Sequence, residues 1–264
     1  MSIHSNNFFS NVLRRQVTVN VILPEPTGPT GGVLSAYARG PQLLPTIWLL
    51  HGLGGDATTW LRRTAIEQLA TQYRVAVVMP QTERGFYTDM VHGPHYWSFL
   101  TQELPARMQY IFPLATDRAR NYVMGNSMGG YAALRWALSE PQRFAAVAAL
   151  SPVADLARFR TEQAAIMPDM DLAFDPQQLD DSSVSLTHLL AHYQPVTPSL
   201  RVLTTTGSAD ILRSMDLALR PQLAAQFGTD FTWQEQVGHH DWSLWNQQLP
   251  AAMHWLMKGS WQVV

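Results

Sequence analysis

Short apolar runs alternate with longer amphipathic segments along most of this chain. The runs are rich in β-branched residues and end at glycine, proline or polar clusters, which is typical of strands buried in a sheet. They cover residues 46–50, 74–79, 121–124, 145–150, 201–206 and 231–237. Because helical segments separate these runs, the pattern predicts an α/β fold with a doubly wound, mostly parallel sheet.

The beginning of the chain follows a different pattern, in which apolar and polar positions alternate. This alternation predicts an antiparallel strand over residues 15–24. The Pro- and Gly-rich residues 24–32 predict a turn, and residues around 33–38 a second antiparallel strand. The N-terminal strands are therefore expected to add to the parallel sheet in antiparallel fashion.

Residues 152–198 lie between two predicted strands and lack clear periodicity. Two interpretations stay open for them: a small cap insertion over the carboxyl ends of the strands, or a crossover helix decorated with surface loops. The sequence has no internal repeat and no low-complexity linker. We therefore expect residues 1–264 to form a single domain, since 264 residues that are 46% apolar can build one large core.

Composition and charge narrow the function classes. The formal net charge of -2 and the lack of any cluster of Lys and Arg argue against nucleic acid as a partner. The chain has no cysteine, which excludes disulfides and thiolate metal sites. Because the sequence shows no signal-like N-terminus and no run of about 18 apolar residues, we expect a cytoplasmic protein without a membrane partner. The low charged fraction of 14% is compatible with a homo-oligomer.

The candidate chemistry centres on Ser127, which lies in the sequence GNSMG at residues 125–129. Apolar residues precede this sequence and a helical segment at 130–139 follows it, so Ser127 is expected on a strand-to-helix turn. Such a turn holds the serine in a strained conformation, and glycines two residues to either side remove the side chains that would collide there. Ser127 is therefore the candidate nucleophile of a hydrolase.

A glycine-rich turn, HGLGG at residues 51–55, follows the predicted strand at 46–50. Its backbone N–H groups are free to point at a substrate oxygen, and Leu53 is the expected donor. A second donor is the N–H of Met128, because the first amides of a helix have no partner within the helix. The two amides predict an oxyanion hole beside Ser127.

The expected acid and base follow in the chain order Ser, Asp, His that is typical of such hydrolases. Asp210 lies just past the predicted strand at 201–206, and catalytic groups of open α/β sheets gather outside the carboxyl ends of strands. Asp216 is the alternative acid, although we expect it on the next helix and facing water. The base lies in the loop at 238–242, where spacing leaves both His239 and His240 open.

Four motifs together resemble the esterase D and tributyrin esterase family of α/β-hydrolases. They are HGLGGD at 51–56, GNSMGGYAAL at 125–134, G-x-x-D at 207–210 and HDW at 240–242. The likeness covers nearly the whole chain and implies the α/β-hydrolase fold. In this family the histidine directly before Asp-Trp is the base, so the resemblance names His240, with His239 as the alternative.

The resemblance implies a serine carboxylesterase for short-chain acyl esters, tributyrin-like and extending to aryl esters such as hydroxycinnamates. In the catalytic triad so implied, His240 takes the proton from Ser127 and Asp210 holds the imidazole in the correct tautomer. The reaction passes through an acyl-enzyme and needs no cofactor. The expected partner is therefore a small-molecule ester.

Three alternatives remain open. One is an S-formylglutathione hydrolase-like thioesterase, although that family commonly carries a cysteine where this chain has Gly-Gly-Asp at 54–56. Another is acyl transfer to an alcohol, as in the similar mycolyltransferases, which are secreted. The third is a hydrolase fold kept as a non-catalytic binding module, a kind of protein that usually loses a member of the triad.

Other histidines and aromatic residues are given simpler interpretations. His188 and His192 are four residues apart but lack the glutamate of a zinc-binding HExxH motif, and we interpret them as surface or packing residues. A metal site at His92 and His95 is likewise not expected, because they have no matched partners. The aromatic residues within 86–97 predict a wall of the cleft. Bulky residues such as Trp97 or Phe174 are expected to close a short acyl pocket.

Overall fold

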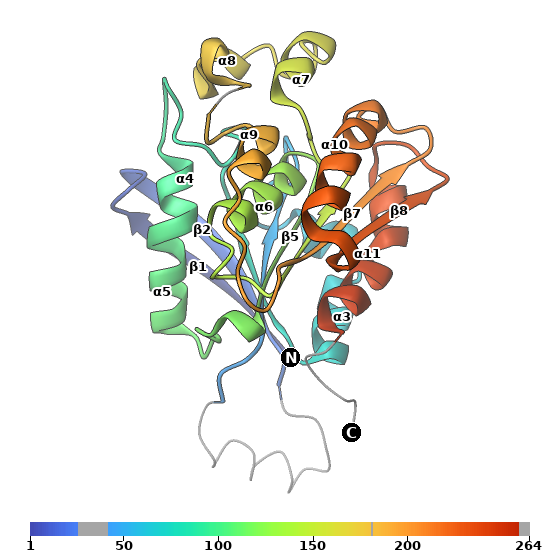
Figure 1. The fold of residues 1–264 in the computed structure, drawn as a ribbon. Helices are drawn as coiled ribbons and strands as arrows, with labels where there is room; N and C mark the ends of the chain where they lie inside the picture. The colour runs from blue at the N-terminus through green and yellow to red at the C-terminus, as the bar shows by residue number, and fades with distance from the viewer. Residues whose placement is uncertain (26–41, 181, 259–264) are drawn as a thin grey trace, which may run out of the picture.

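The computed structural model describes residues 1–25, 42–180 and 182–258, whose strands form an eight-stranded sheet with helices on both faces (Figure 1). The strands are β1 (Ser2–Ser10), β2 (Arg15–Leu23), β3 (Thr46–Leu50), β4 (Ala76–Pro80), β5 (Asn121–Asn126), β6 (Ala146–Leu150), β7 (Arg201–Gly207) and β8 (Phe231–Gln236). Their order across the sheet is β1-β2-β4-β3-β5-β6-β7-β8. Only the β1–β2 and β2–β4 pairs are antiparallel, which confirms the predicted mostly parallel sheet with antiparallel N-terminal strands.

The helices cover the sheet in two layers. They are α2 (Thr59–Arg63), α3 (Ile66–Tyr73), α4 (Tyr96–Ser98), α5 (Leu104–Ile111), α6 (Met128–Ser139), α7 (Leu156–Glu162), α8 (Met170–Ala173), α9 (Leu186–Ala191), α10 (Arg213–Phe227) and α11 (Trp242–Met257). A π-helical stretch, Phe99–Glu103, connects α4 to α5. Helices α5, α6, α9 and α10 pack on one face, and α3 and α11 pack on the other.

Each central strand supplies both hydrophobic cores. In β3, Ile47 and Leu49 join the core under α3 and α11, while Trp48 and Leu50 join the core under α6. Successive side chains of a strand point to opposite faces, so a strand that is covered on both faces needs a continuous apolar run. This requirement explains why the apolar runs in the sequence correctly predicted the parallel strands.

The boundaries of the predicted strands that the structure describes agree with the predictions to within two residues. The run at 74–79 begins its strand only at Ala76, because Arg74 adopts a left-handed conformation with φ 50° that ends α3. The strand predicted around 33–38 lies outside the described residues. Strand β1, which the sequence pattern did not predict, pairs antiparallel with β2 along its whole length. Its residues alternate between exposed and half-buried, as on the edge of a sheet.

The segment 152–198 divides into two parts in space. Helices α7 and α8 lie beyond the end of the sheet at which the parallel strands finish, whereas α9 packs beside α6 in the helical layer (Figure 1). The cap function of this segment stays a prediction. Among the described residues, no helix is both long enough and apolar enough to span a membrane.

Candidate active site

Ser127 lies on the sharp turn between β5 and α6. Its backbone has φ 53° and ψ −118°, a conformation that costs free energy for any residue with a side chain. The turn is held by two hydrogen bonds of 2.9 Å each: the Ser127 N–H donates to the Leu150 carbonyl, and the Ser127 carbonyl accepts from the Tyr131 N–H. The surrounding sheet and helix therefore enforce the strained conformation that the GNSMG sequence predicted.

The two glycines around Ser127 are required by close backbone contacts. A Cβ atom at Gly125 would collide with the carbonyl of Gly129, and one at Gly129 would collide with the carbonyl of Leu50. Both obstacles are backbone atoms of central elements and cannot rotate away. These contacts are the physical reason for the spacing of the glycines in the motif.

Replacing Gly129 with alanine is expected to lower the free energy of unfolding by more than about 3 kcal/mol, because the sheet and α6 must move apart to admit the methyl group. The matched control is Gly228→Ala. Gly228 has a positive φ of 52°, which strains an alanine there, but a Cβ at this position would have open space around it. Gly228→Ala should lower the free energy of unfolding by only about 1 kcal/mol. Urea unfolding of both variants measures the difference, and equal losses would contradict the steric explanation.

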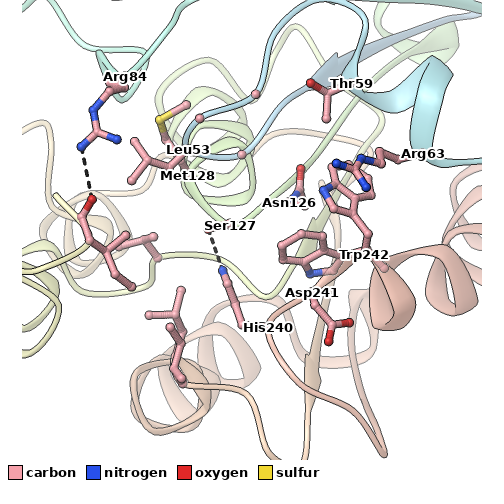
Figure 2. Close-up of a pocket in the computed structure, with 18 of the residues that line it drawn as sticks. Leu53, Thr59, Arg63, Arg84, Asn126, Ser127, Met128, His240, Asp241 and Trp242 are labelled. Atoms are coloured by element: carbon pink, nitrogen blue, oxygen red, sulfur yellow. Dashed lines mark hydrogen bonds between the residues drawn. The ribbon is translucent and has the colours of Figure 1, made fainter.

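Three side chains from separate loops form a continuous hydrogen-bonded chain. The Nε2 atom of His240 lies 2.9 Å from the Ser127 Oγ, and its Nδ1 lies 2.9 and 3.0 Å from the two carboxylate oxygens of Asp210. Figure 2 shows the imidazole pointing at Ser127 inside the pocket. Because a carboxylate only accepts hydrogen bonds, Nδ1 carries the proton and Nε2 keeps a lone pair for the Ser127 hydroxyl.

Asp210 follows β7 and is held as an ionised carboxylate. Burial opposes ionisation and raises its pKa, but the hydrogen bond and charge of His240 and the Leu212 N–H, which donates at 2.8 Å, together lower the pKa below its usual range. The side chain of Asp210 is fully buried, whereas that of His240 is 16% exposed. Asp210 therefore holds the Nδ1 side of the imidazole, and the Nε2 side faces Ser127 and the pocket.

The structure distinguishes between the two histidines that spacing left open. His240 contacts Ser127, whereas His239 is exposed and does not line the pocket. The two side chains diverge in the loop between β8 and α11, where the Asp241 N–H donates to the His239 carbonyl at 2.9 Å and the backbone turns at His240. Asp241 follows them as the N-cap of α11, accepting hydrogen bonds from the N–H groups of Ser243 and Leu244.

Asp216 does not face water, so that expectation was wrong. It lies on α10 but is only 2% exposed, and neither of its carboxylate oxygens has a hydrogen-bond partner of good geometry within the described ranges. Burial and the nearby charge of Asp210 raise its pKa well above the usual range. The spacing of the buried residues 212, 216, 219 and 223 is helical, and this stripe was the signal that the helix buries Asp216.

The Asp216→Asn variant is expected to gain stability over the wild type, and to gain more at about pH 8 than at about pH 5. In the wild type a native pKa above the unfolded value of 3.8 means that the folded chain binds more protons. Stability then falls as pH rises from the unfolded to the native pKa, by about 1.4 kcal/mol per unit. Asparagine cannot ionise and avoids this loss. Thermal unfolding across pH measures it, and a pH-independent difference in Tm would contradict a raised pKa.

The glycine-rich turn after β3 is fixed by His51, whose role the sequence motif did not reveal. Burial lowers the pKa of His51, so the ring is neutral. Its Nε2 accepts from the Thr82 N–H at 3.2 Å, which leaves Nδ1 to donate to the Gly52 carbonyl at 2.8 Å. His51 thereby holds the turn that carries Leu53 into the pocket beside Met128, the first residue of α6.

Ser151 and Trp245 also support the site and were missed by sequence reasoning. Ser151 follows β6 with a positive φ of 47° and is fully buried. The indole N–H of Trp245 donates to its hydroxyl at 3.2 Å. The Trp245 ring meets His240 edge-on, with centroids 5.0 Å apart. Only the three-dimensional arrangement reveals this wall, because Ser151 is distant in the chain from His240 and Trp245.

Ser127 opens into a pocket of about 460 Å³ whose lining is partly apolar and partly polar. Its apolar half includes Phe86, Phe159 and Ile166, which lie toward Arg84 because Phe86 packs on Phe159 and Arg84 donates to the Ile166 carbonyl. The other half is polar and includes Thr59, Arg62, Arg63, Asp241 and Trp242. Leu53 and Met128 lie between Arg84 and Ser127 in the view of Figure 2, whereas Thr59, Arg63 and Trp242 lie on the opposite side.

The expected closing residues of the pocket were wrong. Neither Trp97 nor Phe174 lines it. Trp97 lies under the guanidinium of Arg135, 3.9 Å from the ring centroid, and Phe174 packs edge-on behind Phe86. Of the aromatic residues in the loop 86–97, only Phe86 reaches the pocket. The side chains turn toward the core because the loop is covered by residues of the 152–198 segment, which the sequence pattern did not reveal.

The remaining histidines form no recognisable ligand set. His188 and His192 stack with ring centroids 4.2 Å apart, and His92 and His95 are exposed. Across the described portion of the chain, no three side chains of the metal-binding types gather in one place.

Comparisons with known proteins extend over nearly the whole chain. A family model described as putative esterase matches residues 10–256. An acetyl esterase of Caldicellulosiruptor saccharolyticus is 28% identical over 269 residues, covering 98% of this chain and 100% of that protein. A substrate-bound fluorophosphonate-binding serine hydrolase of Staphylococcus aureus is 26% identical, with a TM-score of 0.79 over 97% of this chain and 98% of that one. An S-formylglutathione hydrolase of the same species is 26% identical, with a TM-score of 0.80 over the same shares.

Proposed function

The chain belongs to the esterase family that this model describes and is a serine hydrolase, and we propose that it acts as a carboxylesterase on esters of short acyl chains. The family membership confirms the resemblance inferred from the sequence motifs. The observation that carries the proposal is the hydrogen-bonded chain from Ser127 through His240 to Asp210 at the base of a pocket. The experiment that tests it is ester turnover by the wild type and by Ser127→Ala.

In the proposed mechanism Ser127 attacks the ester carbonyl while His240 Nε2 takes the hydroxyl proton. The new C–O bond gives a tetrahedral oxyanion, which the N–H groups of Leu53 and Met128 stabilise, each by about 3 kcal/mol. Collapse breaks the bond to the alcohol, which leaves with the proton from His240. A water molecule then repeats the sequence on the acyl-enzyme and releases the acid. Asp210 stabilises the imidazolium in both steps.

The apolar half of the pocket is the proposed acyl site. Phe86 and Phe159 pack with centroids 5.6 Å apart, and Ile166 follows them along the wall. Phe159 and Ile166 belong to the 152–198 segment, which we propose acts as a cap. Arg84 tethers this segment: it pairs with Asp169 at 2.6 Å and donates to the Ile166 carbonyl at 3.2 Å. A tethered aromatic wall limits the depth available to an acyl chain.

We expect kcat/KM to be highest for acyl chains of two to four carbons and to fall for chains of eight or more. In an open apolar groove each buried methylene contributes about 0.8 kcal/mol, so kcat/KM would climb with length. The wall of Phe86 and Phe159 should stop that climb. Measuring kcat/KM on p-nitrophenyl esters from C2 to C12 tests this expectation, and a continuous rise through C10 would contradict the closed pocket.

A thioesterase of the S-formylglutathione hydrolase kind is the second candidate, favoured by the likeness to the Staphylococcus aureus structure. The same serine chemistry serves both reactions, so only substrate recognition separates them. Comparing kcat/KM for S-formylglutathione with that for p-nitrophenyl acetate decides between the two. A preference for the thioester by more than about a hundredfold would replace the carboxylesterase proposal. If the wild type hydrolysed neither substrate, the result would instead favour a non-catalytic binding module.

A further inference from the structure

Three arginines line the pocket, but their charges are not equivalent. Arg84 is neutralised by its bidentate contact with Asp169. Arg62 lies 3.8 Å from Asp56, whose carboxylate also accepts from Thr58 and Thr59. Arg63 has no ion pair or hydrogen bond with any other residue that the structure describes. Of the three guanidiniums, that of Arg63 therefore lacks a counter-ion among the residues that the structure describes.

The position of Arg63 on α2 directs it toward the substrate space. Thr59 and Arg63 are four residues apart, so they share one face of the helix, and both line the pocket. Trp60, three residues before Arg63, is buried next to this face, and its ring meets that of the pocket residue Trp242 edge-on at 5.1 Å. Packing of Trp60 thus fixes the rotation of α2, and Figure 2 shows Arg63 beside Thr59 and Trp242.

The acidic residue in the same half of the pocket is already engaged. Asp241 accepts from the N–H groups of Ser243 and Leu244, at 2.9 and 3.2 Å. Its charge is compensated by the positive end of α11, so it does not neutralise Arg63. It still disfavours a ligand with two negative charges. A singly charged carboxylate, which matches the planar fork of a guanidinium, fits this half best.

We propose that Arg63 is the anion-recognising residue of a subsite for a carboxylate on the alcohol part of the ester. The inference rests on the proposed esterase function and names its substrate class: short-chain acyl esters of hydroxy acids. The acyl chain occupies the apolar half, since a charge beside Phe86 and Phe159 would lose its hydration without gaining a partner. The alcohol part then extends past Ser127 toward Arg63, and its carboxylate meets the free guanidinium.

The test compares two acetate esters of nearly the same shape, one with a negative charge and one neutral, and the comparison between enzyme variants cancels their different intrinsic reactivity. The substrates are 4-carboxyphenyl acetate and its neutral isostere 4-carbamoylphenyl acetate, and the readout is the ratio of their kcat/KM values. We expect the wild type to favour the carboxylate. Arg63→Gln should lower this ratio by roughly three- to tenfold, a factor typical of a charge-assisted contact. Arg63→Lys should lower it less, because the charge remains.

Two controls keep the outcome specific. Arg220→Gln removes an exposed arginine that does not line the pocket and should leave the ratio unchanged. The neutral ester measures how active Arg63→Gln remains, so the ratio of the two kcat/KM values cancels any general loss that the substitution causes. Raising the salt concentration should reduce the wild-type ratio, as expected for a solvent-accessible charge.

A second pair of esters tests the orientation. 4-Nitrophenyl hemisuccinate carries its carboxylate on the acyl part, and 4-nitrophenyl 4-oxopentanoate is the neutral match. An Arg63-dependent preference in this pair alone would overturn the assignment to the alcohol side. A carboxylate ratio that Arg63→Gln leaves unchanged in an active enzyme would overturn the subsite but not the esterase. Failure of the wild type to hydrolyse any of the four esters would overturn the proposed function itself.

Discussion

Replacing Ser127 with alanine is expected to lower kcat for ester hydrolysis by roughly 10⁴- to 10⁶-fold while leaving the fold intact. The hydroxyl is the proposed nucleophile, and no other group in the chain of hydrogen bonds can form the acyl-enzyme. Alanine keeps the Cβ atom that the turn already accommodates at φ 53°. The side chain loses only its hydrogen bond with His240. Turnover of p-nitrophenyl butyrate and thermal unfolding together measure both parts of the expectation.

The control for this substitution is Ser208→Ala. Ser208 is exposed just after β7 and should be replaceable without loss of activity. A Ser127→Ala variant that retained more than about a tenth of the wild-type kcat would remove Ser127 from the mechanism. A variant that lost both activity and thermal stability would instead show that the hydroxyl is needed for the turn.

His240→Ala is expected to lower kcat by at least about 10³-fold, whereas His239→Ala should cost less than about tenfold. Only the imidazole of His240 lies between Ser127 and Asp210, so only this ring can accept the serine proton with Asp210 aligned behind it. The two variants change the same residue type at adjacent positions, which makes each the control for the other. Turnover of one p-nitrophenyl ester by both variants measures the contrast.

The reverse pattern, an inactive His239→Ala and an active His240→Ala, would contradict the assignment of the base. Equal and severe losses would indicate that the loop between β8 and α11 has collapsed. Thermal unfolding distinguishes that case, because His239 is exposed and its removal should not change Tm.

Local steric requirements made the turn at Ser127 predictable from the sequence. Any such turn forms close backbone contacts at the positions of Gly125 and Gly129, so the glycine spacing in the sequence is enough to predict the turn. The buried parallel strands were predictable for a similar reason, since each must be apolar on both faces. In contrast, spacing left His239 and His240 open, because adjacent side chains in a loop diverge in directions that only the folded backbone defines.

Features that depend on packing between distant segments were harder to predict. Asp216 was expected at the surface because it is charged, yet it completes the apolar stripe of α10 and is buried beside Asp210. Trp97 and Phe174 were expected in the pocket because they are bulky. Trp97 instead packs against Arg135, and Phe174 packs against Phe86. Strand β1 was overlooked because an edge strand needs few apolar residues.

The most direct test of the central claim is to treat the protein with a serine-directed fluorophosphonate and locate the adduct by peptide mass spectrometry. We predict one adduct per chain, on Ser127, because only this hydroxyl shares a hydrogen bond with His240 in the described structure. The adduct should be absent from Ser127→Ala and should form in step with the loss of esterase activity. Labelling at another serine, such as Ser151 or Ser208, with Ser127 left unmodified, would contradict the account.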